Sequence, residues 1–166
     1  VGVLAAGAAS VTVTSSTTDG RITASGTRGT VTITDNTVSR DQIDVSRPDG
    51  APYTSAVTIT GNTISAGGLY VSSLNSSATA TPIVITGNNV TGSPSLFSVR
   101  IIDAQLRPSN VTGNTTPLGR IFYGGTLVED WRLRATGQDQ LYGNFTVAAD
   151  ATLTIAAGAT VEFGED

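Results

Sequence analysis

Two acidic residues, Asp103 and Glu129, have position numbers that differ by 26, and Asp130 directly follows the second. Asparagines recur elsewhere in the chain at the same interval, so a chain that winds with this period would place the two carboxylates one turn apart. Adjacent turns of stacked strands lie roughly 5 Å apart, which is the carboxylate separation that retaining glycosidases use. Three arginines belong to the same region: Arg100, Arg107 and Arg132. Paired acids near arginines on a repeat surface are usually solvated ion pairs, and we expect this arrangement here, with catalysis as the alternative.

A column of apolar residues is the second candidate for a functional surface. At the same interval Asp44 is followed by Tyr70, Leu96 and Phe122. Alternation along a strand turns this column outward, because the columns on either side of it are mostly apolar and inward-facing: Ile43, Leu69, Ser95 and Ile121, and then Val45, Val71, Phe97 and Tyr123. With the nearby Trp131, the column forms an exposed stripe that marks a contact surface. We expect a subunit interface there, and the alternatives are glycan binding and burial under the chain's own loops.

The composition excludes several kinds of chemistry. The 166 residues include no Cys and no His, and all nine basic residues are Arg. Disulfides, zinc fingers, thiol nucleophiles and imidazole bases are therefore absent, and we expect no cofactor and no metal site. A net charge of −4 with scattered arginines argues against nucleic acid. No apolar run is long enough to span a bilayer, so we expect no membrane insertion.

The element that must position these residues is a repeat. The segment VTITDNTV at residues 31–38 returns as VTITGNTI, IVITGNNV and the weaker SNVTGNTT. The position numbers of its asparagines rise by 26 at every step: Asn36, Asn62, Asn88 and Asn114. Apolar residues alternate inside the unit, so each turn buries its apolar row by stacking on its neighbours. Asn tolerates a left-handed bend, and its amide can bond to the same amide one turn away. We therefore expect a structural asparagine ladder, with a sugar-binding or catalytic role as the alternative.

The pattern V-x-I-T-G-N-x-I, followed by a small-residue loop and a second short strand, resembles the right-handed parallel β-helix repeat of pectate-lyase-like and phage tail-spike proteins. The resemblance covers residues 20–134. It implies an all-β fold of about five coils and says little about activity, because this fold carries lyases, hydrolases, adhesins and inert shafts. The His- and Lys-containing motifs of the polygalacturonases are missing, and the calcium-binding carboxylates of pectate lyases cannot be mapped onto this chain.

The organisation along the chain is expected to change twice. Residues 11–33 form an early, shorter coil, and regular coils run over residues 31–134 as part of a β-helix domain at 1–134. After Arg134 the period fails, and residues 135–166 read as a β-rich extension that serves oligomerisation or links to a further domain. Their phrases, such as GNFTV and ATLTI, resemble segments of phage tail-fibre shafts and bacterial surface proteins.

These features predict a structural component of a virion or surface fibre, such as a phage tail fibre, tail spike or decoration protein. Its role would be that of a rigid spacer and attachment module with host glycan contact, located on the virion, or otherwise on a bacterial surface or secreted. The expected partners are two further copies in a homotrimer, other virion or surface proteins, and a surface polysaccharide. We do not expect an enzyme. The alternatives are a polysaccharide lyase or glycoside hydrolase that uses Asp103, Glu129 and Asp130, and a bacterial adhesin.

Overall fold

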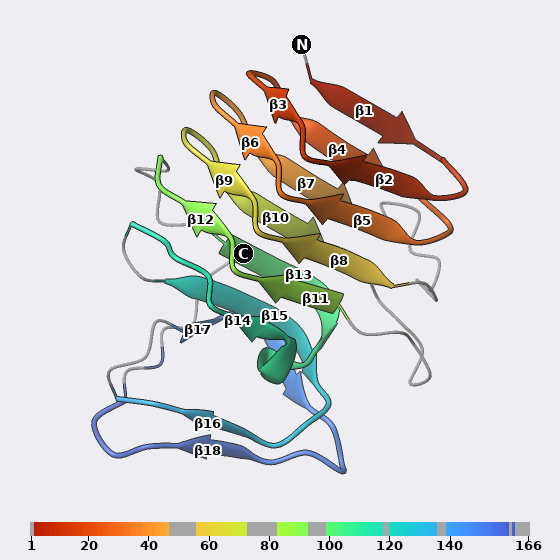
Figure 1. Ribbon diagram of the computed structural model, residues 1–166. Coiled ribbons are helices and arrows are strands. Elements are labelled where there is room, and N and C mark those ends of the chain that lie inside the picture. The colour runs from red at the N-terminus through yellow and green to blue at the C-terminus, as the bar shows by residue number, and fades with distance from the viewer. Residues whose placement is uncertain are drawn as a thin grey trace.

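The computed structural model describes seven stretches of the chain, and every structural statement below concerns them: residues 2–46, 56–72, 83–92, 99–117, 120–135, 139–159 and 161. Almost all regular structure in these stretches is β-strand, and every pairing between strands is parallel (Figure 1). The one helical element is a short 3-10 turn, η1 (Pro108–Asn110).

The strands form two long sheets and two smaller ones. The seven-stranded sheet contains, in spatial order, β1 (Val3–Ala6), β4 (Ile22–Ser25), β7 (Ile43–Ser46), β10 (Leu69–Ser72), β13 (Val99–Leu106), β15 (Ile121–Leu127) and β17 (Asp139–Val147). The five-stranded sheet contains β2 (Val11–Thr14), β5 (Val31–Thr34), β8 (Val57–Thr60), β11 (Ile83–Thr86) and β14 (Val111–Thr112). The four-stranded sheet contains β3 (Thr17–Thr18), β6 (Thr37–Val38), β9 (Thr63–Ile64) and β12 (Asn89–Val90). The last pair joins β16 (Trp131–Leu133) to β18 (Leu153–Ile155).

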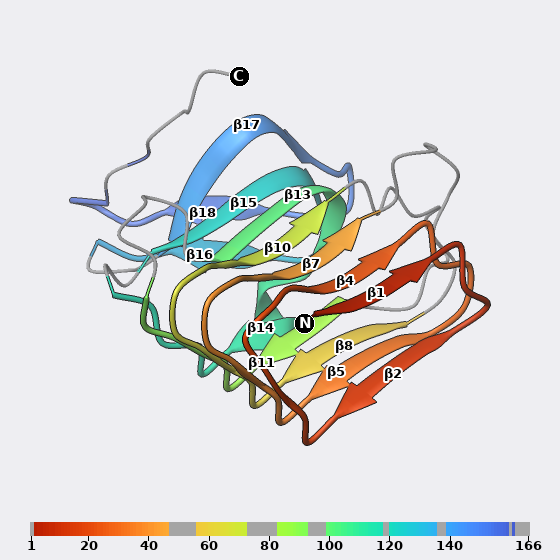
Figure 2. The same ribbon diagram turned by 90° about the horizontal axis from the view of Figure 1, so that it is seen from above.

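From β1 to β12 each turn contributes one strand to each of the three larger sheets, and the chain is a parallel β-solenoid of about six turns. Seen from its N-terminal end, the chain winds clockwise as it recedes, which makes the solenoid right-handed (Figure 2). The predicted fold class is therefore confirmed. The sequence indicated about five coils, and the difference arises because β1 and β17 also stack on β4 and β15.

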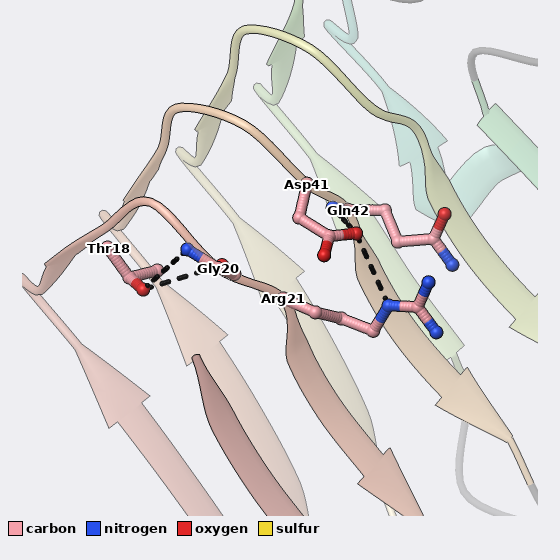
Figure 3. Close-up of polar contacts among 5 residues, drawn as sticks. All are labelled: Thr18, Gly20, Arg21, Asp41 and Gln42. Carbon is pink, nitrogen blue, oxygen red and sulfur yellow. Dashed lines mark hydrogen bonds and ion pairs between the residues drawn. The ribbon is translucent and has the colours of Figure 1, made fainter. Parts of the chain in front are cut away.

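The alternation of the strands builds the core between the sheets. In β5 and β8 the first and third residues are fully buried, whereas the threonines between them are half-buried on the outer face. The early coil is shorter than the next, as predicted, because Val11 pairs with Val31, whereas Val31 pairs with the more distant Val57. At the corner after β3, Thr18 bonds to Gly20, and Arg21 on this turn contacts Asp41 on the next (Figure 3). This ion pair is solvent-exposed, so it contributes little to stability.

The regular interval holds in the five-stranded sheet from β5 onward but not in the seven-stranded one. Leu69 pairs with Val99, which makes this turn longer than the regular interval, and Val99 pairs with Ile121, which makes the next turn shorter by the same amount. The two turns together equal two regular ones, so the register recovers at Ile121. Val99 and Ile101 fill the two places in the core that the sequence assigned to Ser95 and Phe97, which themselves lie outside the described residues. Burial of a valine avoids placing a serine hydroxyl among apolar side chains.

The bend after each strand of the five-stranded sheet depends on a left-handed residue. The sequence pattern placed the bend at each Gly-Asn pair and allowed either residue to be left-handed; in the structure the asparagines do not carry the positive φ. The residue immediately before each asparagine carries the positive φ: Asp35 (55°), Gly61 (67°), Gly87 (63°) and Gly113 (67°). Glycine adopts this backbone without a steric cost. The asparagine side chain is thereby turned inward, into the stack.

The stacking continues past the predicted boundary at Arg134. Strand β17 pairs with β15 and β18 pairs with β16, so residues 139–155 add a further turn to the solenoid. The cross-section changes earlier than this boundary, because the four-stranded sheet ends at β12 and the five-stranded sheet ends at β14. An oligomerisation role for residues 135–166 stays a prediction.

Candidate functional site

The four asparagines form the ladder that their spacing predicted. Nδ2 of Asn36 donates to Oδ1 of Asn62 at 2.9 Å, Asn62 bonds to Asn88 in the same way, and Asn88 to Asn114. Each Oδ1 also accepts from the backbone N–H of the preceding asparagine at 3.0 Å. The second Nδ2 hydrogen is donated to a backbone carbonyl, such as that of Ile33 for Asn62. The first three side chains are buried and donate both of their amide hydrogens, which explains them as structural groups.

A groove opens where the ladder ends. The five-stranded sheet stops at β14, and the next strand along the chain after β15, β16, pairs with β18 instead of β14. Figure 1 shows β16 and β18 set apart from β14 at the blue end of the solenoid. The resulting cavity of about 610 Å³, here called the terminal groove, has one wall in the segment from Pro108 to Asn114. The other wall carries Glu129, Asp130, Trp131, Arg132, Arg134 and Asp139.

Two of the predicted acids, Glu129 and Asp130, lie in the terminal groove, where both make structural hydrogen bonds. The carboxylate of Glu129 accepts from the backbone N–H of Ser109 at 2.7 Å and from its hydroxyl at 2.8 Å. Oδ1 of Asp130 accepts from the backbone N–H of Thr152 at 2.8 Å. Both carboxylates therefore connect neighbouring turns of the chain.

The third predicted acid, Asp103, lies elsewhere. It is exposed on β13, at an irregularity where its φ is 51°. The register pairs Ala104 with Gly125, whereas Glu129 sits beside Ser109. The expected pairing of Asp103 with Glu129 is wrong, because adjacent turns are offset by less than the regular interval here. The arginines are also dispersed: Arg132 lines the terminal groove, but Arg100 lies over the Tyr142 ring on the seven-stranded sheet, 4.3 Å from its centroid.

The predicted outward stripe is only partly present. Tyr70 is half-buried on the outer face of the seven-stranded sheet, and its partner in the next strand is Arg100. Leu96, which was expected at that place, lies outside the described residues. Phe122 is buried within the single chain, with 6% of its surface exposed, and its ring meets that of Tyr142 edge-on. Tyr142 belongs to strand β17, so Phe122 is buried by its own chain, although the third alternative expected loops to cover it.

Trp131 does not extend the stripe. It belongs to the β16–β18 pair, and its ring packs at 5.1 Å from that of Tyr123, which is a core residue. Tyr70 instead borders a smaller hollow of about 250 Å³ on the outer face of the seven-stranded sheet, together with Gln42, Asp44, Ser72, Arg100 and Ile102.

Sequence reasoning missed a pair of titratable groups beside the terminal groove. Asp139 and Tyr123 lie close enough to shift each other's pKa, and Asp139 is the first residue of β17, next to Ile121 of β15. Burial raises the pKa of Asp139 above its ordinary value of 3.8, while the Tyr123 hydroxyl and the charge of Arg134 act against this rise. The pKa of Tyr123 is raised as well, by burial and by the adjacent carboxylate. The step from Ile121 to Asp139 departs from the regular interval, so no repeat pattern could reveal the pair.

Replacement of Asp139 by asparagine should raise the free energy of unfolding at pH 7. The folded protein binds the Asp139 proton more tightly than the unfolded chain, so ionisation costs stability as the pH rises from 3.8 through the higher folded pKa. The variant should lose this decline and match the wild type below that range. Guanidinium unfolding from pH 3 to pH 7 measures the effect, with the exposed Asp150→Asn as control. A less stable variant at pH 7 would overturn the assignment.

The described residues include no group of three or more His, Asp, Glu or Cys side chains that could hold a metal ion. No helix among them is long and apolar enough to cross a membrane.

Comparisons with family models, curated proteins and solved structures found no match to the chain. The fold and the ladder define the chain as a parallel β-solenoid repeat protein.

Proposed function

We propose that this solenoid is a rigid structural module of a virion or surface fibre that acts as a spacer and as an attachment surface. The observation that carries the proposal is the uninterrupted amide ladder, which ties successive turns together along the axis. Parallel backbone pairing adds to it in every turn. A stack in which each turn is bonded to the next resists bending and local opening, which is what a spacer requires.

The residues that would support catalysis favour this structural role over an enzyme. Glu129 and Asp130 are engaged in hydrogen bonds to neighbouring turns, and Asp103 is not beside them. The polysaccharide-cleaving alternative therefore lacks the carboxylate pair on which it rested. Turnover of an acidic polysaccharide by the wild type, abolished in Glu129→Gln, would nevertheless restore it.

Immunogold labelling of intact virions and unpermeabilised cells from the source tests the location that this role requires. Antibodies against the solenoid should label fibres or the outer surface. Labelling that appears only after the cells are opened would contradict the proposal.

A homotrimer remains part of the proposal. Light scattering on the purified chain should give three times the mass of one chain, 16.8 kDa. A purely monomeric species would remove the trimer without affecting the spacer role, because the stacking lies within one chain.

A further inference from the structure

At the last rung of the asparagine ladder, the place that each earlier rung gives to the Oδ1 of the next asparagine lies beyond Asn114. At every earlier rung, the backbone N–H and one Nδ2 hydrogen converge on the Oδ1 of the next asparagine, at 3.0 and 2.9 Å. Asn114 donates its other Nδ2 hydrogen to the carbonyl of Ile85 at 2.8 Å. Within the described part of the chain, neither of its two remaining donors has an acceptor.

This position lies in the terminal groove, because Asn114 is part of the groove's wall. The regular geometry of the ladder fixes what fits there: an oxygen that accepts two hydrogen bonds, as the oxygen of a carboxamide does at each rung above. Asn114 is half-buried, so a ligand that covers it must supply this oxygen, because donors that are withdrawn from water without an acceptor cost free energy.

The surrounding charges select a neutral acceptor over an anion. Three acids line the groove, Glu129, Asp130 and Asp139, against two arginines, Arg132 and Arg134. A carboxylate ligand would meet more negative than positive charge, whereas an amide oxygen carries no net charge into the site.

The remaining lining fits a sugar. Trp131, the only tryptophan in the chain, is half-buried and lines the same groove as Asn114. The volume of about 610 Å³ is in the range of small-ligand sites, which combine such surfaces with a few fixed polar groups.

We propose that the terminal groove binds an N-acetylated amino sugar, with the acetamido oxygen placed where the next asparagine of the ladder would put its Oδ1. The inference deepens the attachment role proposed above, on which it rests, by naming the chemistry of the ligand. The donors are the backbone N–H and Nδ2 of Asn114, and Trp131 contacts the sugar ring.

Fluorescence titration tests the proposal, since Trp131 is a unique reporter inside the groove. N-acetylglucosamine should give a saturable change in emission, and glucose, which lacks the amide, should give none at equal concentrations. A saturable response to glucuronate instead of N-acetylglucosamine would show that the groove binds a carboxylate and not an amide, and would overturn the assignment. An equal or tighter response to N-acetylasparagine amide would assign the groove to a peptide and likewise overturn it. No response to any probe would also overturn it.

Asn114→Asp keeps the oxygen that accepts from Asn88 and replaces the donating amide with an acceptor. This variant should lose at least about tenfold in affinity for N-acetylglucosamine, and the matched change at an exposed position, Asn89→Asp, should lose none. Thr112→Arg obstructs the groove from an exposed position and leaves the ladder intact, so it should abolish binding even if Asn114→Asp unfolds the protein. Unchanged affinity in Thr112→Arg would contradict the proposal. Because binding is measured on the purified chain, its failure is independent of the labelling experiment on virions and cells.

Discussion

Replacement of Asn88 by alanine is expected to lower the free energy of unfolding by at least about 3 kcal/mol. The Asn88 amide donates to Asn114 and to the carbonyl of Ile59, and its oxygen accepts twice from Asn62. Alanine removes all four bonds and leaves their partners unsatisfied inside the stack, where water cannot replace the lost groups. Chemical denaturation monitored by circular dichroism measures the loss.

The neighbouring asparagine supplies the control. Asn89 is exposed, and Asn89→Ala should change the free energy of unfolding by no more than about 0.5 kcal/mol. Equal losses in the two variants would show that the destabilisation comes from the turn as a whole and not from the ladder.

The second large effect is expected at Ile101, which tests the register of the seven-stranded sheet. Ile101 is buried in the core, with 2% of its surface exposed, and it pairs with Val71 and Tyr123. Ile101→Ala should therefore cost about 3 kcal/mol through lost burial and the cavity left behind. Guanidinium unfolding at neutral pH measures this cost.

Ile102 allows the same chemical change one residue away, on the opposite face of β13. It is half-buried beside the hollow that contains Tyr70, so Ile102→Ala should cost at most about 1 kcal/mol. A larger loss at Ile102 than at Ile101 would mean that the strand is shifted by one residue, since such a shift exchanges its two faces.

The strictly periodic part of the molecule could be predicted from the sequence. Four asparagines at one interval, following strands of alternating apolar residues, indicated both the stacking and the ladder, and the structure has both. The reason is physical: in a parallel stack, identical residues at one interval lie above one another, so one sequence column reports one column in space.

Departures from the interval could not be predicted in this way. A long turn followed by a short one moves Arg100 into the place assigned to Leu96. Because the two turns together are as long as two regular turns, the period of the sequence does not reveal this shift. Loop length is weakly constrained, because lengthening a loop costs little free energy. The choice between registers is made by burial, which favours Val99 and Ile101 over the alternative that includes Ser95.

The candidate site was the least predictable part for the same reason. The terminal groove exists because β16 does not continue the five-stranded sheet after β14. It brings Glu129, Asp130 and Trp131 together with Asn114, and it excludes Asp103. The position of Asn114 at the end of its ladder was visible in the sequence, because the next place in the column is occupied by Gln140 and the run of asparagines stops there. The terminal groove beyond Asn114 could be found only from the three-dimensional arrangement of the strands.

Hydrogen exchange of the side-chain amides, followed by NMR on labelled protein, tests the stacked ladder most directly. The Nδ2 protons of Asn36, Asn62 and Asn88 are predicted to exchange orders of magnitude more slowly than those of the exposed Asn89, because they are released only when the turns separate. Exchange of all four side chains at the same fast rate would contradict the in-register solenoid, and with it the spacer role and the site at its end.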